Sequence, residues 1–233
     1  MTRAPIAVAL DTHDLELAAR WAEAVTPQVS TLKIGLELYL RHGPQVFASV
    51  RGGSGVDIFL DLKLHDIPAT VAGAARAVAS LRPTFLTVHA SGGPTMIRAA
   101  VEALPDTRIA AVTVLTSLDD SDLDEIGLIG PLTDAVRRLS VRAVEAGARA
   151  LVCSPREVAS VRAEVGPDIV LVTPGVRPAG TGAQDQVRIA TPEQAIADGA
   201  DLIVVGRPIT GAADPGAAAA ALASSLRRLH LTA

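Results

Sequence analysis

Three charged side chains alternate in sign over six positions at the end of one apolar segment. Asp61 and Lys63 lie within residues 56–64, and Asp66 follows where this run must end. In an extended strand, successive side chains point to opposite faces, so Asp61 and Lys63 share one face while the other face is entirely aliphatic. Because the aliphatic face must be buried, we expect the charged face to line a polar cavity. A lysine kept charged by carboxylates can stabilise developing negative charge and then donate a proton.

Lysine is rare in this chain. Of its 21 basic residues, 19 are arginines and only Lys33 and Lys63 are lysines. Arginine does not give up its proton near neutral pH, whereas a partly buried lysine can. The two lysines therefore indicate positions where arginine would fail, with chance retention as the alternative interpretation.

The elements that position these residues form a repeating pattern. Short apolar runs alternate with segments expected to be helical, among them 15–25, 37–50, 132–146 and 213–229. Capping signals mark two helix starts, Ser154 with Glu157 and Thr191 with Gln194. The apolar runs are residues 6–10, 31–36, 56–64, 85–90, 109–115, 150–153, 168–174 and 202–206.

Eight strand–helix alternations without a linker predict a single (β/α)8 TIM barrel, an α/β fold, as one domain over residues 1–233. Such barrels typically have about 250 residues. An open doubly wound sheet is the alternative. It is disfavoured because no G-x-G-x-x-G turn follows the first apolar run, where residues 10–13 read LDTH.

In a barrel of this kind, functional sites form at the carboxyl ends of the strands. A salt-bridge network is the structural alternative for the charged set there, but buried ion pairs stabilise a fold poorly, so function is the better explanation.

The glycine-rich connection after the seventh run, together with Arg177, Gln186 and Arg207, suggests a phosphate site. The polar residues at the strand ends are Asp11, Lys33, Asp61, Lys63, His89, Thr116, Arg177 and Arg207.

Composition excludes several classes of function. A net charge of −4 and five aromatic residues argue against a nucleic-acid surface. No run approaches the roughly 20 apolar residues of a membrane span, and the N-terminus does not resemble a signal peptide. The single cysteine, Cys153, forbids an internal disulfide and fits a reducing compartment. We therefore expect a cytoplasmic protein that binds a small phosphorylated molecule.

Residues 61–70 read DLKLHDIPAT, which resembles the signature of the orotidine 5′-phosphate decarboxylase family. The D-x-K-x-x-D core is shared with sugar-phosphate relatives, whereas HDIPAT, PGVRP and VGRPIT are more specific to the bacterial decarboxylases. The resemblance covers nearly the whole chain. Its further matches are ALD at 9–11, LKIG at 32–35, TVHASGG at 87–93, VLTS at 114–117, TPGVRP at 173–178, DQVR at 185–188 and VGRPIT at 205–210.

The resemblance implies decarboxylation of orotidine 5′-monophosphate to UMP, without cofactor or metal, on a homodimer with shared active sites. Lys63, Asp61 and Asp66 would be catalytic, with Asp66 and Thr70 supplied by the partner subunit. The resemblance also implies the other substrate contacts. Asp11 and Lys33 would hold the ribose, Thr116 would lie near the pyrimidine, and Arg177, Gln186, Gly206 and Arg207 would bind the 5′-phosphate, with Gln184 a less favoured choice than Gln186.

Two other functions remain open at this point. The nearest is a Mg²⁺-dependent decarboxylase or aldolase acting on a sugar phosphate, in which the carboxylates would bind the metal. The other is a non-catalytic barrel that binds a nucleotide phosphate. Retention of Asp61, Lys63 and Asp66 disfavours this last function, because a sensor needs no proton donor.

Overall fold

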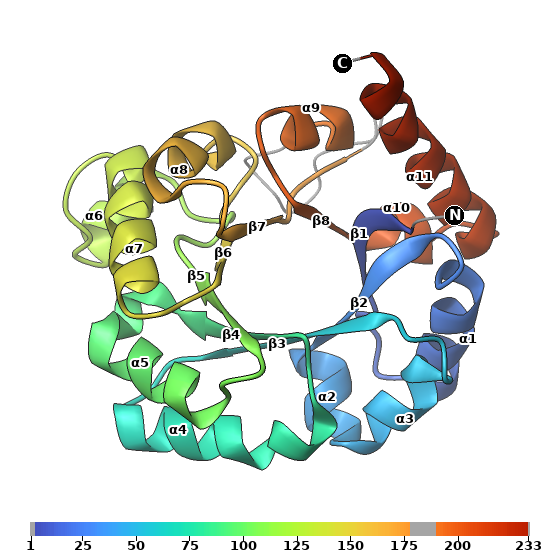
Figure 1. Ribbon diagram of the computed structural model, residues 1–233, viewed down its shortest axis with the longest axis horizontal. Coiled ribbons are helices and arrows are strands. Elements are labelled where there is room, and N and C mark those ends of the chain that lie inside the picture. The colour runs from blue at the N-terminus through green and yellow to red at the C-terminus, as the bar shows by residue number, and fades with distance from the viewer. Residues whose placement is uncertain (1–2, 178–189, 233) are drawn as a thin grey trace.

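Eight strands form a closed ring with helices around it in the computed structural model, which describes residues 3–177 and 190–232 (Figure 1). Each strand pairs in parallel with the next, and β8 pairs with β1. This closure confirms the predicted (β/α)8 barrel and excludes the open sheet. The strands are β1 Ala4–Ala9, β2 Val29–Gly35, β3 Asp57–Leu64, β4 Phe85–His89, β5 Arg108–Val112, β6 Ala150–Val152, β7 Val170–Thr173 and β8 Leu202–Val205.

Helices connect successive strands outside the ring. They are α1 Leu15–Val25, α2 Leu36–His42, α3 Gln45–Arg51, α4 Pro68–Ala77, α5 Gly93–Ala103, α6 Asp120–Glu125, α7 Leu132–Glu145, α8 Val158–Val165, α9 Pro192–Ala197, α10 Arg207–Thr210 and α11 Pro215–Thr232, with 3-10 turns at Ala79–Leu81 and Ala90–Gly92. No helix within the described ranges is long and apolar enough to cross a membrane.

Two local predictions need correction. The single helix expected over 37–50 is two helices, because Gly43 adopts φ +62° and Pro44 follows it, ending α2 before α3 begins. The Ser154 cap does not begin a helix directly. The carboxylate of Glu157 accepts hydrogen bonds from the Ser154 amide at 3.1 Å and from the Ser154 hydroxyl, and α8 starts only at Val158.

The cap predicted at Thr191 is confirmed. The Thr191 hydroxyl accepts a hydrogen bond from the Gln194 amide at 3.2 Å, and Pro192 occupies the first position of α9.

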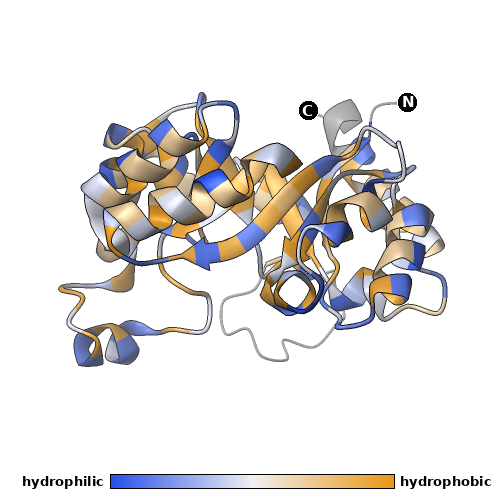
Figure 2. Cartoon of the chain, turned by 90° about the horizontal axis from the view of Figure 1, so that it is seen from below, coloured by the Kyte–Doolittle hydropathy of each residue, from blue (hydrophilic) through white to orange (hydrophobic). Residues whose placement is uncertain are grey.

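The barrel has two apolar layers, one inside the ring and one between the ring and its helices. Along β3, Ile58 and Leu60 pack outward against the helices, whereas Phe59 packs inside the ring. Its ring meets that of Phe85 edge to face, with centroids 5.7 Å apart. Figure 2 shows the central strands as mainly hydrophobic. The alternation predicted for residues 56–64 therefore holds, and it sends the side chains that follow Phe59 on the same face toward the barrel mouth.

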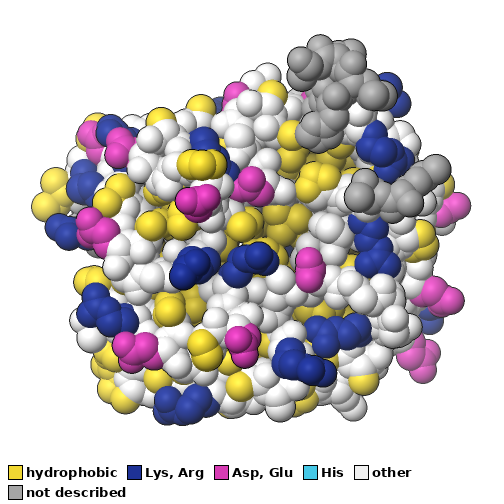
Figure 3. All heavy atoms as spheres, viewed as in Figure 1, with side chains coloured by type: hydrophobic (Ala, Val, Ile, Leu, Met, Phe, Trp, Pro, Cys, Tyr) yellow, Lys and Arg dark blue, Asp and Glu magenta, His cyan; other side chains and the backbone are white. Residues whose placement is uncertain are grey.

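On the face seen in Figure 3, positive and negative side chains are interspersed. The described side chains on this face form no continuous basic area of the kind that a nucleic-acid surface requires.

Candidate active site

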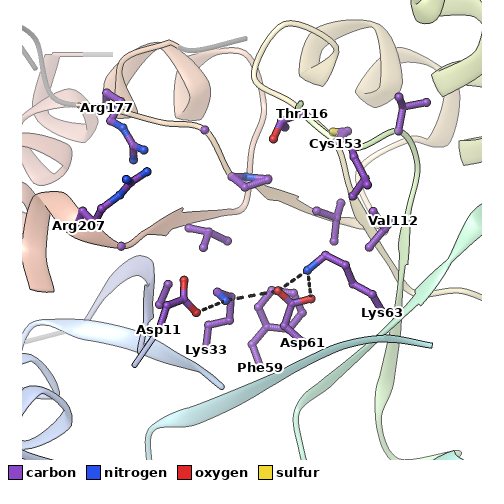
Figure 4. Close-up of a pocket in the computed structure, with 18 of the residues that line it drawn as sticks. Asp11, Lys33, Phe59, Asp61, Lys63, Val112, Thr116, Cys153, Arg177 and Arg207 are labelled. Carbon is purple, nitrogen blue, oxygen red and sulfur yellow. Dashed lines mark hydrogen bonds and ion pairs between the residues drawn. The ribbon is translucent and has the colours of Figure 1, made fainter. Parts of the chain in front are cut away.

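A cavity of about 460 Å³ lies over the carboxyl ends of the strands (Figure 4). Its walls come from several strands and from the segments that follow them, as expected for a barrel of this architecture. Eight of the eleven residues that the sequence proposed for the site line this one cavity. They are Asp11, Lys33, Asp61, Lys63, Thr116, Arg177, Gly206 and Arg207.

Four of these side chains form a continuous chain of alternating charge (Figure 4). The Lys33 ammonium lies 3.0 Å from Asp11 Oδ1 and 3.4 Å from Asp61 Oδ2. The Lys63 ammonium lies 2.9 Å from both carboxylate oxygens of Asp61. Asp61 is therefore shared by two ammonium groups, and Lys63, whose side chain is 32% exposed, is the one that reaches farther toward solvent.

This arrangement fixes the charge of its two most buried members. Burial raises the pKa of Asp61, but the ammonium groups of Lys33 and Lys63 outweigh burial and hold that pKa below its usual value. Burial lowers the pKa of Lys33, but the carboxylates of Asp61 and Asp11 outweigh it and raise the pKa. Both groups are thus ionised near neutral pH, and a negative charge stays beside Lys63.

The backbone brings these side chains together through two local features. Gly35 ends β2 beside the charged chain, where a Cβ would lie 2.8 Å from Asp11 Oδ1, so a larger residue would push this carboxylate away. In β3, Lys63 adopts φ +48°, a left-handed conformation that is uncommon for residues other than glycine. Left-handed residues outside glycine concentrate at functional sites, where the surrounding structure holds them.

The opposite end of the cavity is positively charged. The guanidinium groups of Arg177, just after β7, and Arg207, which starts α10, point toward each other in Figure 4. The cavity lining also includes apolar side chains, among them Phe59, Val112 and Val204. The cavity can therefore hold a molecule with an anionic group near the two arginines and a group with apolar faces near Lys63.

Two of the proposed residues that the structure describes are not brought into the cavity of this chain. Asp66 and Thr70 are exposed at the start of α4, and the Asp66 carboxylate accepts a hydrogen bond from the Ile67 amide at 2.6 Å. Gln186 lies outside the described residues. Within the described ranges, no group of three or more His, Cys, Asp or Glu side chains could hold a metal ion.

Two polar residues of β4 lie beside the charged chain. His89 was named from the sequence only as a polar strand end, and Thr87 was not singled out. Thr87 is fully buried and its hydroxyl lies 3.0 Å from Asp61 Oδ1. The ring of His89 lies 5.3 Å from that of His65, and burial lowers the pKa of His89, with His65 and Lys63 adding to the effect. Both β4 residues follow Phe85 at intervals of two, and this alternation could have placed them inside the barrel.

An eight-stranded parallel barrel with a charged cavity at its carboxyl end is the architecture of TIM-barrel enzymes, and this chain is one of them. The sequence profile of the orotidine 5′-phosphate decarboxylase / HUMPS family matches residues 4–222. The chain belongs to this family.

Proteins named orotidine 5′-phosphate decarboxylase are similar to this chain over nearly its whole length. The orotidine 5′-phosphate decarboxylase of Thermobifida fusca is 71% identical over 225 residues, covering 97% of each chain. That of Frankia casuarinae is 59% identical and covers 96% of this chain and 88% of that protein. The crystal structure of the Lactobacillus acidophilus enzyme has a TM-score of 0.83 and 37% identity, covering 96% of this chain and 99% of that one.

Proposed function

We propose that this protein decarboxylates orotidine 5′-monophosphate (OMP) to UMP, the last step of pyrimidine nucleotide synthesis, using neither cofactor nor metal. The single observation that carries the proposal is the Lys63 ammonium held 2.9 Å from both oxygens of Asp61, inside a cavity whose other end presents two arginines. The names of the close relatives supply the substrate.

Loss of CO₂ leaves the electron pair of the broken bond on C6 of the pyrimidine, where no adjacent carbonyl group can delocalise it. The protein must therefore stabilise this charge electrostatically. The Lys63 ammonium lowers the energy of the developing carbanion, and then transfers a proton to C6. The neutral amine takes up a proton from solvent before the next cycle.

Asp61 has two roles in this mechanism. It holds the Lys63 ammonium in place, and it faces the carboxylate of the bound substrate. Two carboxylates about 4 Å apart repel each other by roughly 4 kcal/mol at an effective dielectric constant of about 20. This repulsion disappears as CO₂ leaves, which favours the reaction.

The remaining residues bind the substrate. Asp11 and Lys33 hold the ribose hydroxyls, and Thr116 lies near the pyrimidine ring. Arg177 and Arg207 bind the 5′-phosphate, together with the backbone at Gly206 and the side chain of Gln186. Because the 5′-phosphate takes no part in the bond that breaks, the energy gained by binding it can be used to order the site.

We further propose that the enzyme is a cytoplasmic homodimer whose subunits are single domains, residues 1–233, and whose active sites lie between subunits. Asp66 and Thr70 then enter the site of the partner subunit. Ile67, directly after Asp66, supports this arrangement because its large apolar side chain is 66% exposed in the single chain. Burial of such a residue against a second subunit would stabilise the dimer.

The proposed reaction is tested by mixing purified protein with OMP in excess EDTA and following the loss of orotate absorbance. We expect rapid loss with UMP as the product. No loss in a protein shown to be folded and dimeric would instead favour the Mg²⁺-dependent sugar-phosphate reaction, with Asp61 and Asp66 as metal ligands.

Replacing Arg207 with alanine tests the phosphate assignment. Because a charged hydrogen bond to a phosphate oxygen is lost, we expect UMP affinity to fall about 10- to 100-fold in calorimetric titration. Uridine lacks the phosphate, so its affinity should be the same in both proteins. Arg156→Ala, at an exposed position outside the cavity, is the matched control. Unchanged UMP affinity in Arg207→Ala contradicts the assignment.

A further inference from the structure

Strand β3, which carries Asp61 and Lys63, loses its regular pairing with its neighbour β4 beyond Leu60. Leu60 pairs with Leu86 and Leu64 pairs with Val88, so four steps along β3 match only two steps along β4. This bulge holds Asp61 and Lys63, and within it Lys63 adopts its left-handed conformation with φ +48°. Bulges re-aim side chains near active sites, and a strained residue in one persists only when other groups hold it.

Thr87 is the one residue of β4 that lies between the two paired positions, and its hydroxyl makes two bonds across the bulge. Thr87 Oγ1 accepts a hydrogen bond from the Lys63 backbone amide at 2.8 Å. The same hydroxyl donates its proton to Asp61 Oδ1 at 3.0 Å. A hydroxyl has one proton to donate and can accept at the same time, so both bonds form together.

These bonds replace the strand pairing that the bulge removes. Without Thr87, the Lys63 amide would be a partly buried donor that has lost this bond, which is a costly state. Asp61 Oδ1 receives both the Thr87 hydroxyl and the Lys63 ammonium, so the hydroxyl limits rotation of the carboxylate. Thr87 does not line the cavity and is fully buried, so it acts through its neighbours and not on the substrate.

We propose that Thr87 is a positioning residue for the decarboxylation, because it fixes the Lys63 backbone and the Asp61 carboxylate at the same time. This inference rests on the proposed function. Without the hydroxyl, the Lys63 backbone can relax toward a regular strand conformation and the Asp61 carboxylate can turn. The ammonium then spends less time in the orientation that stabilises the C6 carbanion, whereas substrate binding changes little.

The test compares Thr87→Val, which keeps the shape and removes the hydroxyl, with Thr87→Ser, which keeps the hydroxyl. Loss of the bond to a charged group should lower kcat for OMP by about 10- to 100-fold in Thr87→Val. KM should change by less than about threefold, since Thr87 makes no substrate contact. Thr87→Ser should recover kcat to within about threefold of the unsubstituted enzyme.

A matched control is available in β7. Thr173 is also a fully buried strand threonine, but its hydroxyl has no hydrogen-bond partner in the described structure. Thr173→Val therefore removes a buried hydroxyl without touching the charged chain, and kcat should stay unchanged. Should Thr87→Val not fold, Thr87→Ala takes its place, and failure of both to fold would assign Thr87 to stability alone and overturn the inference.

A second readout needs no turnover. The chain has only two lysines, so protein labelled with ¹³C-lysine gives two side-chain ε signals by NMR, one each from Lys33 and Lys63. We expect Thr87→Val to shift the Lys63 signal more than the Lys33 signal, and Thr173→Val to shift neither.

If the unsubstituted protein does not consume OMP, the proposed function fails, while this comparison still tests the position of Lys63. Unchanged kcat and an unchanged Lys63 signal in Thr87→Val, or a Thr87→Ser variant as impaired as Thr87→Val, overturns the inference.

Discussion

Replacing Lys63 with alanine should lower kcat for OMP by about 10⁴-fold or more. The variant loses both the charge that stabilises the C6 carbanion and the acid that protonates it, and each contributes factors of about 10² to 10⁴. The fold should survive, because Asp61 keeps its second ammonium partner, Lys33 Nζ, at 3.4 Å. Steady-state turnover measured beside a calorimetric UMP titration separates loss of chemistry from loss of the site.

Lys63→Arg is the informative comparison for this residue. It keeps a positive charge near Asp61 but offers a group that does not release its proton near neutral pH. We expect UMP binding to remain measurable in both Lys63 variants and turnover to be lost in both. Near-normal turnover in Lys63→Ala would remove Lys63 from the mechanism.

Two inactive variants should recover activity when their subunits are mixed. In the proposed dimer, each site takes Lys63 from one subunit and Asp66 from the other. A mixed dimer of Lys63→Ala and Asp66→Ala subunits therefore has one intact site and one doubly substituted site. With random reassociation, half of the dimers are mixed, so we expect about a quarter of the unsubstituted activity.

The control for this experiment mixes Lys63→Ala with Asp61→Ala. Both residues come from the same subunit, 2.9 Å apart, so no mixed dimer has an intact site and activity should not return. Activity in the first mixture that only equals the sum of its two parents would show that Asp66 does not act across the interface.

Much of this site could be predicted from sequence because strand alternation is local. The spacing of Asp61 and Lys63 placed both on the face that lines the cavity, and the end of β2 placed Lys33 beside them. The position of Asp66 could not be settled in this way. Its side chain is exposed in the single chain, and its role in the site depends on the proposed second subunit.

Other features depend on contacts between distant parts of the chain. The left-handed backbone of Lys63 has no sequence signal, since glycine is the usual residue there. It arises because β3 and β4 fall out of register, and the partner that stabilises it, Thr87, is 24 residues away. The break between α2 and α3, by contrast, could have been predicted, because Gly43 and Pro44 are residue types that end helices.

The most direct test of the central claim, decarboxylation by Lys63 through a C6 carbanion without a metal, is OMP turnover in D₂O with excess EDTA. Proton NMR follows H6 of the product. We expect complete conversion to UMP that carries deuterium at C6, and no conversion by Lys63→Ala. No conversion by the folded, unsubstituted protein, or conversion that requires added Mg²⁺, would rule out this metal-free mechanism.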